Sequence, residues 1–321
     1  MMTAMADCVD EALSLFGLAN ATATLLRHNE NRTYRIDCME ASYCLRLKNP
    51  VSGFDLSVFG GSPEDLLRGE LILIGTVGAH ADIPVQAPVR TSSGGMAARL
   101  SDGTLASLLS WMNGTTLKEG PRSEQMLFSA GQTLATLRTA AEENPALRGF
   151  PRLAYDQNLL RRLRAKAEQG YEYLSDESIR SITSALAAVS SVMDELDDLE
   201  ASAIAHADPG FGNLIWTGER IGLIDWSLSG YAHSYMDIGG LMGATADRYE
   251  QRCLLRGWES VRGMVNRRYL DAYFSLSVLL FVCCQHTRAH EWSEWFPSAL
   301  KRWQATIFDP LAAGCTISCI L

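Results

Sequence analysis

The most informative stretch of this sequence reads Ala203-Ile-Ala-His206-Ala-Asp208-Pro-Gly-Phe-Gly-Asn213-Leu-Ile-Trp216 and, after a turn at Thr217 to Arg220, continues Ile221-Gly-Leu-Ile-Asp225-Trp226. The short apolar runs on either side of the turn are typical of buried strands. The segment between Asp208 and Asn213 contains one proline and two glycines, so we expect a loop there. Catalytic groups often lie on loops held by a rigid scaffold. The stretch therefore predicts two carboxylates and an amide oxygen placed close together.

Asp208, Asn213 and Asp225 are the groups that a phosphoryl-transfer site requires. Asp208 can accept the proton of an attacking hydroxyl. Asp225 and the amide oxygen of Asn213 can hold Mg²⁺ against the phosphates of a nucleotide, because Mg²⁺ is a hard cation that prefers oxygen ligands. The alternative is that His206 and Asp208 only close a turn and that Asp225 only ends a strand. The complete spacing, His-x-Asp-x-x-x-x-Asn followed by Ile-Asp-Trp, favours the catalytic interpretation.

This stretch resembles the catalytic loop of the aminoglycoside phosphotransferase and choline kinase family, small-molecule kinases with a protein-kinase-like fold. The family pattern is close to His-Gly-Asp-x-x-x-x-Asn followed by Ile-Asp-Trp or Ile-Asp-Phe. Here Ala207 replaces the usual glycine, and Gly210 stands where many members carry a second histidine. The resemblance implies that Asp208 is the catalytic base, that Asn213 and Asp225 are metal ligands and also bind the nucleotide, and that ATP and Mg²⁺ are the cofactors.

The resemblance also implies an α+β fold of two lobes. Residues 1–110 would form the nucleotide-binding lobe, a small antiparallel sheet with one helix, and residues 111–114 a hinge in which Trp111 meets the adenine. Residues 115–321 would form a mainly helical lobe with the catalytic loop and the acceptor site. The length of 321 residues is itself that of two compact lobes.

The first lobe is expected to begin with an amphipathic helix over residues 8–18. The polar region from Asn20 to Asn31 then leads into a hairpin of strands at Thr33–Asp37 and Tyr43–Lys48. Alternation along the second strand places Leu45 and Leu47 on one face and Cys44, Arg46 and Lys48 on the other. By the resemblance, Arg46 occupies the position of a phosphate-contacting lysine; the alternative is that Arg46 and Lys48 are solvated charges.

A helix is expected to start at Ser62 and to run to about Val77, since Ser is a good cap and proline and acids follow it. Glu70 lies on this helix and resembles the glutamate that pairs with the strand cation and so helps to bind the nucleotide; a surface glutamate is the alternative. The lead-in Glu30-Asn31-x-x-Tyr34 resembles the nucleotide loop of the family.

The second lobe is expected to be mainly helical. Apolar residues spaced three or four positions apart predict a helix with one buried face, formed by Leu127, Ala130, Leu134, Leu137 and Ala141. Further helices are expected over 156–169, 177–193, 267–284 and 291–308. The acidic run from Asp194 to Glu200 is expected to be a solvated loop.

Two polar residues follow the proposed metal ligand. Asp237 resembles the buried family aspartate that braces the catalytic loop. His233 could point into the acceptor cleft, although a structural or solvent-facing histidine is favoured.

Composition limits the partners. A net charge of −9 argues against nucleic acid and is compatible with a cationic acceptor. The sequence has no run of eighteen apolar residues and no apparent secretory signal, so we expect neither a membrane span nor disulfides among the eight cysteines, and a cytoplasmic location. The oligomeric state stays open.

Three functions compete at this stage. The first is an ATP-dependent phosphotransferase that acts on a hydroxyl of a small metabolite or antibiotic, or on Ser and Thr hydroxyls of a peptide. The second is a catalytically silent nucleotide-binding regulator, which the joint presence of Asp208, Asn213 and Asp225 argues against. The third is a hydrolase that uses His206 and Asp208 with a metal, which lacks a further ligand cluster.

Overall fold

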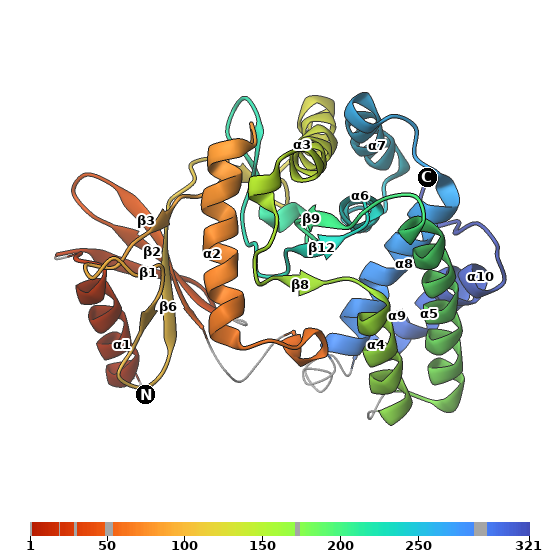
Figure 1. Ribbon diagram of the computed structural model, residues 1–321, viewed down its shortest axis with the longest axis horizontal. Helices are drawn as coiled ribbons and strands as arrows, with labels where there is room; N and C mark the ends of the chain where they lie inside the picture. The colour runs from red at the N-terminus through yellow and green to blue at the C-terminus, as the bar shows by residue number, and fades with distance from the viewer. Residues whose placement is uncertain (1, 19, 29–30, 49–53, 171–173, 286–293) are drawn as a thin grey trace.

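The computed structural model describes residues 2–18, 20–28, 31–48, 54–170, 174–285 and 294–321. Figure 1 shows a small sheet lobe and a larger helical lobe, with the long helix α2 (Pro63–His80) between them. This is the α+β, two-lobe arrangement that the sequence predicts. None of the helices in the described ranges is both long and apolar enough to cross a bilayer.

The sheet of the first lobe is antiparallel, with strand order β1-β2-β3-β6-β4 and with β5 paired to β6. Its strands are β1 (Thr22–His28), β2 (Asn31–Asp37), β3 (Ser42–Lys48), β4 (Pro88–Val89), β5 (Ala98–Arg99) and β6 (Leu105–Ser110). The predicted hairpin is confirmed, because β2 and β3 pair from Asn31 opposite Lys48 to Asp37 opposite Ser42.

The prediction of a lead-in without a strand before the hairpin is wrong, because β1 lies there and pairs with β2. Residues 22–27 of β1 are exposed, and even the apolar Leu25 and Leu26 are 46% and 50% exposed to solvent. An edge strand with no buried face lacks the alternation that marks a strand in sequence. The predicted Glu30-Asn31 motif is only partly covered, since residues 29–30 lie outside the described residues.

Helix α1 (Met2–Leu15) packs on the sheet, so the described part of the lobe has two α-helices rather than one. The predicted helix over 8–18 therefore starts earlier and ends at Leu15, before Gly17 at φ 71°. A small core joins α1 to one sheet face through Leu13, Phe16, Leu45 and Leu47. The predicted alternation along β3 is thus confirmed, and Arg46 is left for the opposite face.

Helix α2 begins where the sequence predicts. The Ser62 hydroxyl accepts the Asp65 amide at 3.1 Å, and proline and two acids fill the first turn. The predicted stripe of Leu67, Leu71 and Ile74 is buried. Glu70 lies beside this stripe and reaches Arg46 on β3.

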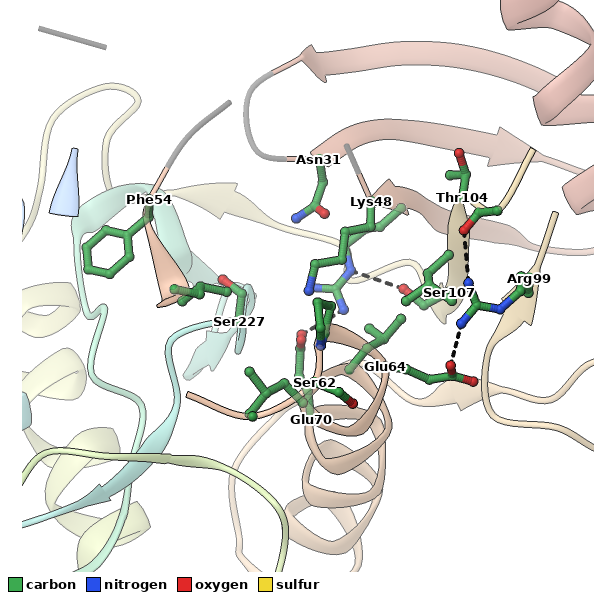
Figure 2. Close-up of a pocket in the computed structure, with 18 of the residues that line it drawn as sticks. Asn31, Lys48, Phe54, Ser62, Glu64, Glu70, Arg99, Thr104, Ser107 and Ser227 are labelled. Atoms are coloured by element: carbon green, nitrogen blue, oxygen red, sulfur yellow. Dashed lines mark hydrogen bonds and ion pairs between the residues drawn. The ribbon is translucent and has the colours of Figure 1, made fainter. Parts of the chain in front are cut away.

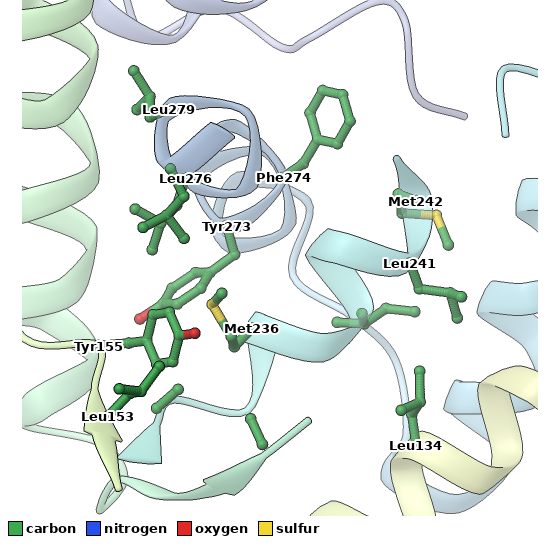
Figure 3. Packing of buried hydrophobic residues seen from close by; sticks show 14 of the residues in the cluster. Leu134, Leu153, Tyr155, Met236, Leu241, Met242, Tyr273, Phe274, Leu276 and Leu279 are labelled. Carbon is green, nitrogen blue, oxygen red and sulfur yellow. The ribbon is translucent and has the colours of Figure 1, made fainter. Parts of the chain in front are cut away.

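The second lobe contains α3 (Glu124–Glu143), α4 (Gln157–Gln169), α5 (Asp176–Asp197), α6 (Tyr235–Met242), α7 (Arg248–Arg262), α8 (Arg267–Cys284), α9 (Phe296–Trp303) and α10 (Asp309–Ala312), with a π-helix over Gln304–Phe308. Figure 3 shows the core of this lobe, where Tyr155, Met236 and Tyr273 pack together. The predicted face of α3 is buried as expected.

Two small sheets carry the predicted catalytic stretch. One is formed by β7 (Thr115–Thr116), β10 (Leu214–Trp216) and β11 (Ile221–Leu223), and the other by β8 (Leu153–Ala154), β9 (Ala203–Ala205) and β12 (Gly230–Ala232). The strands predicted on each side of the Thr217 turn pair as β10 and β11. The loop with Asp208 and Asn213 therefore runs from β9 to β10, and Asp225 follows the end of β11.

Three helix predictions need correction. The acidic run is not a loop at its start, because α5 continues to Asp197 with Leu196 buried on its apolar stripe. Helices α6 and α7 were not expected. The helix predicted over 291–308 begins only at Phe296, after a turn at residues 294–295, and continues as a π-helix from Gln304; residues 286–293 lie outside the described residues.

Candidate active site

The catalytic loop is anchored by a buried aspartate. The Asp237 carboxylate accepts the backbone amides of His206 and Ala207 at 3.0 and 2.7 Å. Ala207 has φ 61°, in the left-handed region that a glycine would adopt without strain. The expectation that Asp237 braces the loop is confirmed, and its two hydrogen bonds hold Ala207 in that conformation.

His206 supports the loop from beneath and does not enter the cleft. Its side chain is fully buried, its Nε2 lies 2.9 Å from the Ile224 carbonyl oxygen, and its ring packs 4.9 Å from that of Trp226. Burial lowers the pKa of His206 despite the nearby carboxylates, so the ring is neutral and Nε2 donates to the carbonyl. His206 thereby ties the loop to the strand that ends before Asp225.

Asp208 and Asn213 form the centre of the loop. The Asn213 amide nitrogen donates to the Asp208 carboxylate at 2.8 Å and to its carbonyl oxygen at 3.0 Å. Asn213 lies in a short 3₁₀ turn (Phe211–Asn213), and its own carbonyl accepts the Ile224 amide at 3.0 Å. The structure therefore brings Asp208, Asn213 and the residue preceding Asp225 together, as the spacing predicts.

Asp225 has an unusual backbone. Its φ is 59°, which is strained for a residue other than glycine. Its carboxylate accepts the Ser227 hydroxyl at 2.9 Å, lies 3.9 Å from the Arg46 guanidinium, and keeps 29% of its side-chain surface exposed. Strain of this kind often occurs at functional sites.

A buried ion pair faces this loop from the sheet lobe. Arg46 Nη2 lies 2.7 Å from Glu70 Oε1, with 9% and 6% of the two side chains exposed. Burial alone would lower the pKa of Arg46, but Glu70 and Asp225 raise it, so the guanidinium stays charged. The predicted pairing of Arg46 with Glu70 is confirmed, and the alternative of a solvated arginine and a surface glutamate is excluded.

Lys48 lies on the same face of the sheet as Arg46 but lacks an ion-pair partner among the described residues. It is half-buried, and in the described ranges it forms no ion pair with a carboxylate. Burial lowers the pKa of Lys48; Glu70 opposes this change, whereas the neighbouring Arg46 adds to it. Arg46 is thus the cation that α2 holds in place.

A cavity of about 850 Å³ opens beside these cations. Figure 2 shows Lys48 and Ser107 on its sheet side and Glu70 and Ser62 on its α2 side. Ser227, which bonds Asp225, also lines it, whereas Asp208 and Asn213 are not among the described residues that do. The cavity adjoins the catalytic loop rather than enclosing it.

The segment that links the lobes carries Trp111. The Arg35 guanidinium lies 4.8 Å from the Trp111 ring, and the Trp111 amide donates to the Ser42 carbonyl at 3.0 Å. In the described part of the chain, the Trp111 carbonyl and the Met112 amide have no hydrogen-bond partner. Backbone groups at this junction are therefore available to a ligand.

Two further side chains in the site were not predicted. Ser107 accepts from Arg46 Nε at 3.4 Å, and Ser227 bonds Asp225. Ser107 lies opposite Arg46 only because β6 pairs with β3 across 61 residues, which no local pattern reveals. His233, by contrast, is structural as favoured, because it is buried against Tyr273.

The comparisons with known proteins agree with this geometry. The model of the phosphotransferase enzyme family matches residues 22–278. The chain belongs to this family. The match covers both lobes, the Arg46–Glu70 pair and the catalytic loop. The comparison with curated proteins found no match.

Several solved structures of this fold are similar over nearly the whole chain. A microcompartment-associated aminopropanol kinase is 19% identical, with a TM-score of 0.77, covering 96% of this phosphotransferase and 98% of that chain. An amicoumacin kinase solved with AMP-PNP and Ca²⁺ is 16% identical, with a TM-score of 0.67 and coverage of 99% and 97%. A spectinomycin phosphotransferase solved with ADP and spectinomycin is 13% identical, with a TM-score of 0.63 and coverage of 96% and 98%.

Proposed function

We propose that this phosphotransferase transfers the γ-phosphoryl group of ATP to a hydroxyl of a small molecule. The observation that carries the proposal is the joint placement of Asp208, Asn213 and Asp225 beneath the Arg46–Glu70 pair. Such transfer depends mainly on positioning and charge neutralisation, which this arrangement can supply. Residues 1–110 would bind ATP, residues 111–114 would form the hinge, and residues 115–321 would bind the acceptor.

Asp208 would act on the acceptor. Its carboxylate is held by the Asn213 amide at 2.8 Å, so one orientation is fixed before a substrate arrives. A hydroxyl bonded to this carboxylate could pass its proton to it as the new bond to phosphorus forms. Arg46, a planar and permanently charged group, would contact phosphate oxygens, with Glu70 fixing its orientation.

The residues also fit a divalent cation, which we propose to be Mg²⁺. The Asn213 amide nitrogen donates to Asp208, and no described residue donates to Asn213 Oδ1. This hard oxygen is therefore available to bind the cation. Asp225 adds a partly exposed carboxylate. The described residues contain no cluster of three or more His, Cys, Asp or Glu ligands, and Mg²⁺ bound with nucleotide needs only one or two protein carboxylates. Such a cation neutralises charge on the phosphates.

The acceptor is proposed to be a small alcohol that carries an amine. An aminopropanol kinase and two antibiotic kinases share this fold, and the net charge of −9 suits a cationic acceptor. The ATP requirement and the eight free cysteines fit a cytoplasmic protein.

A coupled assay of ADP release tests the function. Purified protein with ATP and Mg²⁺ would be offered small amino alcohols, aminoglycosides, spectinomycin and a Ser-containing peptide, with GTP in parallel. We expect ADP release to rise with at least one amino alcohol or antibiotic and with Mg²⁺ present, and the phosphorylated product to be found by mass spectrometry. ADP release with the peptide alone would assign a protein kinase instead, and no ATP binding at all would contradict the proposal.

A further inference from the structure

Arg152 is a buried arginine whose hydrogen-bond acceptors in the described ranges are all backbone carbonyls. It is only 9% exposed to solvent, and it donates to the carbonyl oxygens of Leu66, Trp226, Ser227 and Ser229 at 2.7 to 3.0 Å. In the described ranges it has no carboxylate within ion-pair distance. A guanidinium offers five N–H donors in a fixed plane, so one side chain can hold several carbonyls at once.

One of these carbonyls belongs to α2. Leu66 lies one helical turn before Glu70, so the Arg152 Nη1 bond of 2.7 Å fixes the part of α2 that carries the ion-pair partner of Arg46. The backbones approach closely here, because a Cβ at Gly69 would lie 2.2 Å from the Pro151 carbonyl oxygen. Gly69 thus lets α2 pack directly against the segment that bears Arg152.

The other three carbonyls follow Asp225 directly. The Ser229 amide and hydroxyl bond the Trp226 carbonyl at 3.0 and 2.7 Å, which closes a tight turn. Arg152 also donates to the Trp226 carbonyl and to those of Ser227 and Ser229 in the same turn. A residue at φ 59° persists only when its surroundings hold it, and this turn begins at the residue after Asp225.

We propose that Arg152 is a positioning residue that sets Asp225 relative to the Arg46–Glu70 pair. The proposal rests on the proposed function and deepens it. It names the group that aligns Asp225, the proposed metal ligand in one lobe, with Arg46, the proposed phosphate contact in the other. Lysine cannot replace it fully, since an ammonium has three donors on a single atom, whereas the Arg152 bonds come from three nitrogens spread around the edges of one plane.

The test compares Arg152→Met and Arg152→Lys with Arg138→Met. Arg138 is the control, because it is 1% exposed and also donates to backbone carbonyls, those of Ala201 and Ala232. Unlike Arg152 it also pairs with Glu142 at 2.6 Å, and in the described ranges it forms no hydrogen bond with α2 or with residues 226–229. Affinity for AMP-PNP would be measured with Mg²⁺ and with chelator. We expect both Arg152 variants to lose most of the Mg²⁺-dependent gain in affinity and about tenfold or more in kcat, as removal of a group that orients a metal ligand does.

Arg138→Met should lower thermal stability but keep the Mg²⁺-dependent gain. Methylguanidinium should partly restore kcat in Arg152→Ala and not in Arg138→Ala. An unchanged Mg²⁺ gain in Arg152→Lys, or an equal loss in Arg138→Met, would overturn the proposal. If Arg152→Met does not fold, Arg152→Lys alone decides.

Hydrogen exchange separates this proposal from the proposed function. In Arg152→Lys, amides of residues 66–70 and 225–229 should gain exchange together, whereas in Arg138→Met they should not. This arm needs no nucleotide. A wild-type protein that binds no Mg²⁺-nucleotide would overturn the proposed function, while separate exchange behaviour of the two segments would overturn the role of Arg152.

Discussion

At the scale of single residues, the site combines strained backbone with fixed side chains. Ala207 and Asp225 both have positive φ. The Ala207 amide donates to the buried Asp237 carboxylate, and Asp225 accepts the hydroxyl of Ser227, which lies in the turn that Arg152 binds. Strain that the surroundings maintain keeps functional groups in place before the ligand binds. The carboxylates are thus oriented by the fold itself.

Asp208→Asn should remove the proposed base and leave the fold intact. The amide is isosteric but cannot accept a proton, so we expect kcat to fall about a hundredfold to ten-thousandfold while AMP-PNP affinity and melting temperature stay near wild type. Single-turnover kinetics and calorimetry check this. Turnover near the wild-type value would remove Asp208 from the mechanism.

Asp225→Ala should weaken nucleotide binding only when Mg²⁺ is present, because the lost contact is to the cation rather than to the base. Titrations with AMP-PNP in Mg²⁺ and in chelator would measure the two affinities. An equal loss under both conditions would assign Asp225 a different role.

Arg46→Ala should raise the ATP requirement and lower kcat together, because Arg46 is the cation fixed by Glu70 at 2.7 Å. Lys48→Ala should have the smaller effect, since Lys48 has no such partner in the described ranges and lies two residues further along β3. Steady-state kinetics of the two variants decide the ranking. The reverse order would show that Lys48 holds the phosphates.

At the scale of elements, α3 and α7 pack with their backbones in close contact. A Cβ at Gly257 would lie 1.9 Å from the Phe128 carbonyl oxygen, and one at Gly131 would lie 1.9 Å from the Leu254 carbonyl oxygen. The two helices touch backbone to backbone, and any side chain at these positions would force them apart. This packing supports α3, which lies against β9 and β11 and so behind the catalytic loop.

Gly257→Ala should therefore destabilise the protein by about 1–3 kcal/mol, the usual cost of overpacking. Gly75→Ala is the matched control: it lies within α2 and its Cβ would meet only Pro88 at 4.0 Å, so better helix propensity should stabilise by about 0.5–1 kcal/mol. Urea unfolding of both variants measures the changes. Equal effects of the two substitutions would contradict the close contact seen between the helices.

The elements that sequence predicted are those with a local signal. Ser62 caps α2, Leu134 belongs to a periodic stripe, and the His206-to-Asp225 spacing lies within one short segment. The elements it missed lack such a signal: β1 has no buried face, and α5 continues through acids that find partners such as Arg268 for Glu195. A run of charges indicates solvent exposure, but it does not indicate where a helix ends.

Arg152 escaped prediction for a related reason. Its partners are carbonyls between Leu66 and Ser229, and a carbonyl belongs to every residue type. Sequence can indicate that a carboxylate suits a metal, but it cannot indicate which backbone groups a distant arginine will meet. The residues that carry the proposed chemistry could therefore be predicted, whereas the contacts that position them required the fold.

At the scale of the whole molecule, a buried histidine makes stability depend on pH. His233 is 1% exposed, with Nδ1 2.6 Å from the Tyr273 hydroxyl and Nε2 3.0 Å from Asp197. Burial lowers the pKa of His233 below its ordinary value of 6.5, although Glu200 and Asp197 oppose the change and Arg138 adds to it. The folded state therefore binds a proton on this ring less readily than the unfolded state does.

The sign of the pH dependence follows from this shift. Stability from His233 is fully present above the unfolded pKa of 6.5 and is lost as the pH falls through that value toward the lowered folded pKa. We expect the free energy of unfolding, measured with urea, to fall from pH 7.5 to pH 5.5, about the range in which histidine changes charge. His233→Gln should reduce that fall, because glutamine has no proton to gain. His80→Gln, at an exposed position, should leave it unchanged. An identical fall in His233→Gln and the wild type would show that the loss of stability comes from other groups.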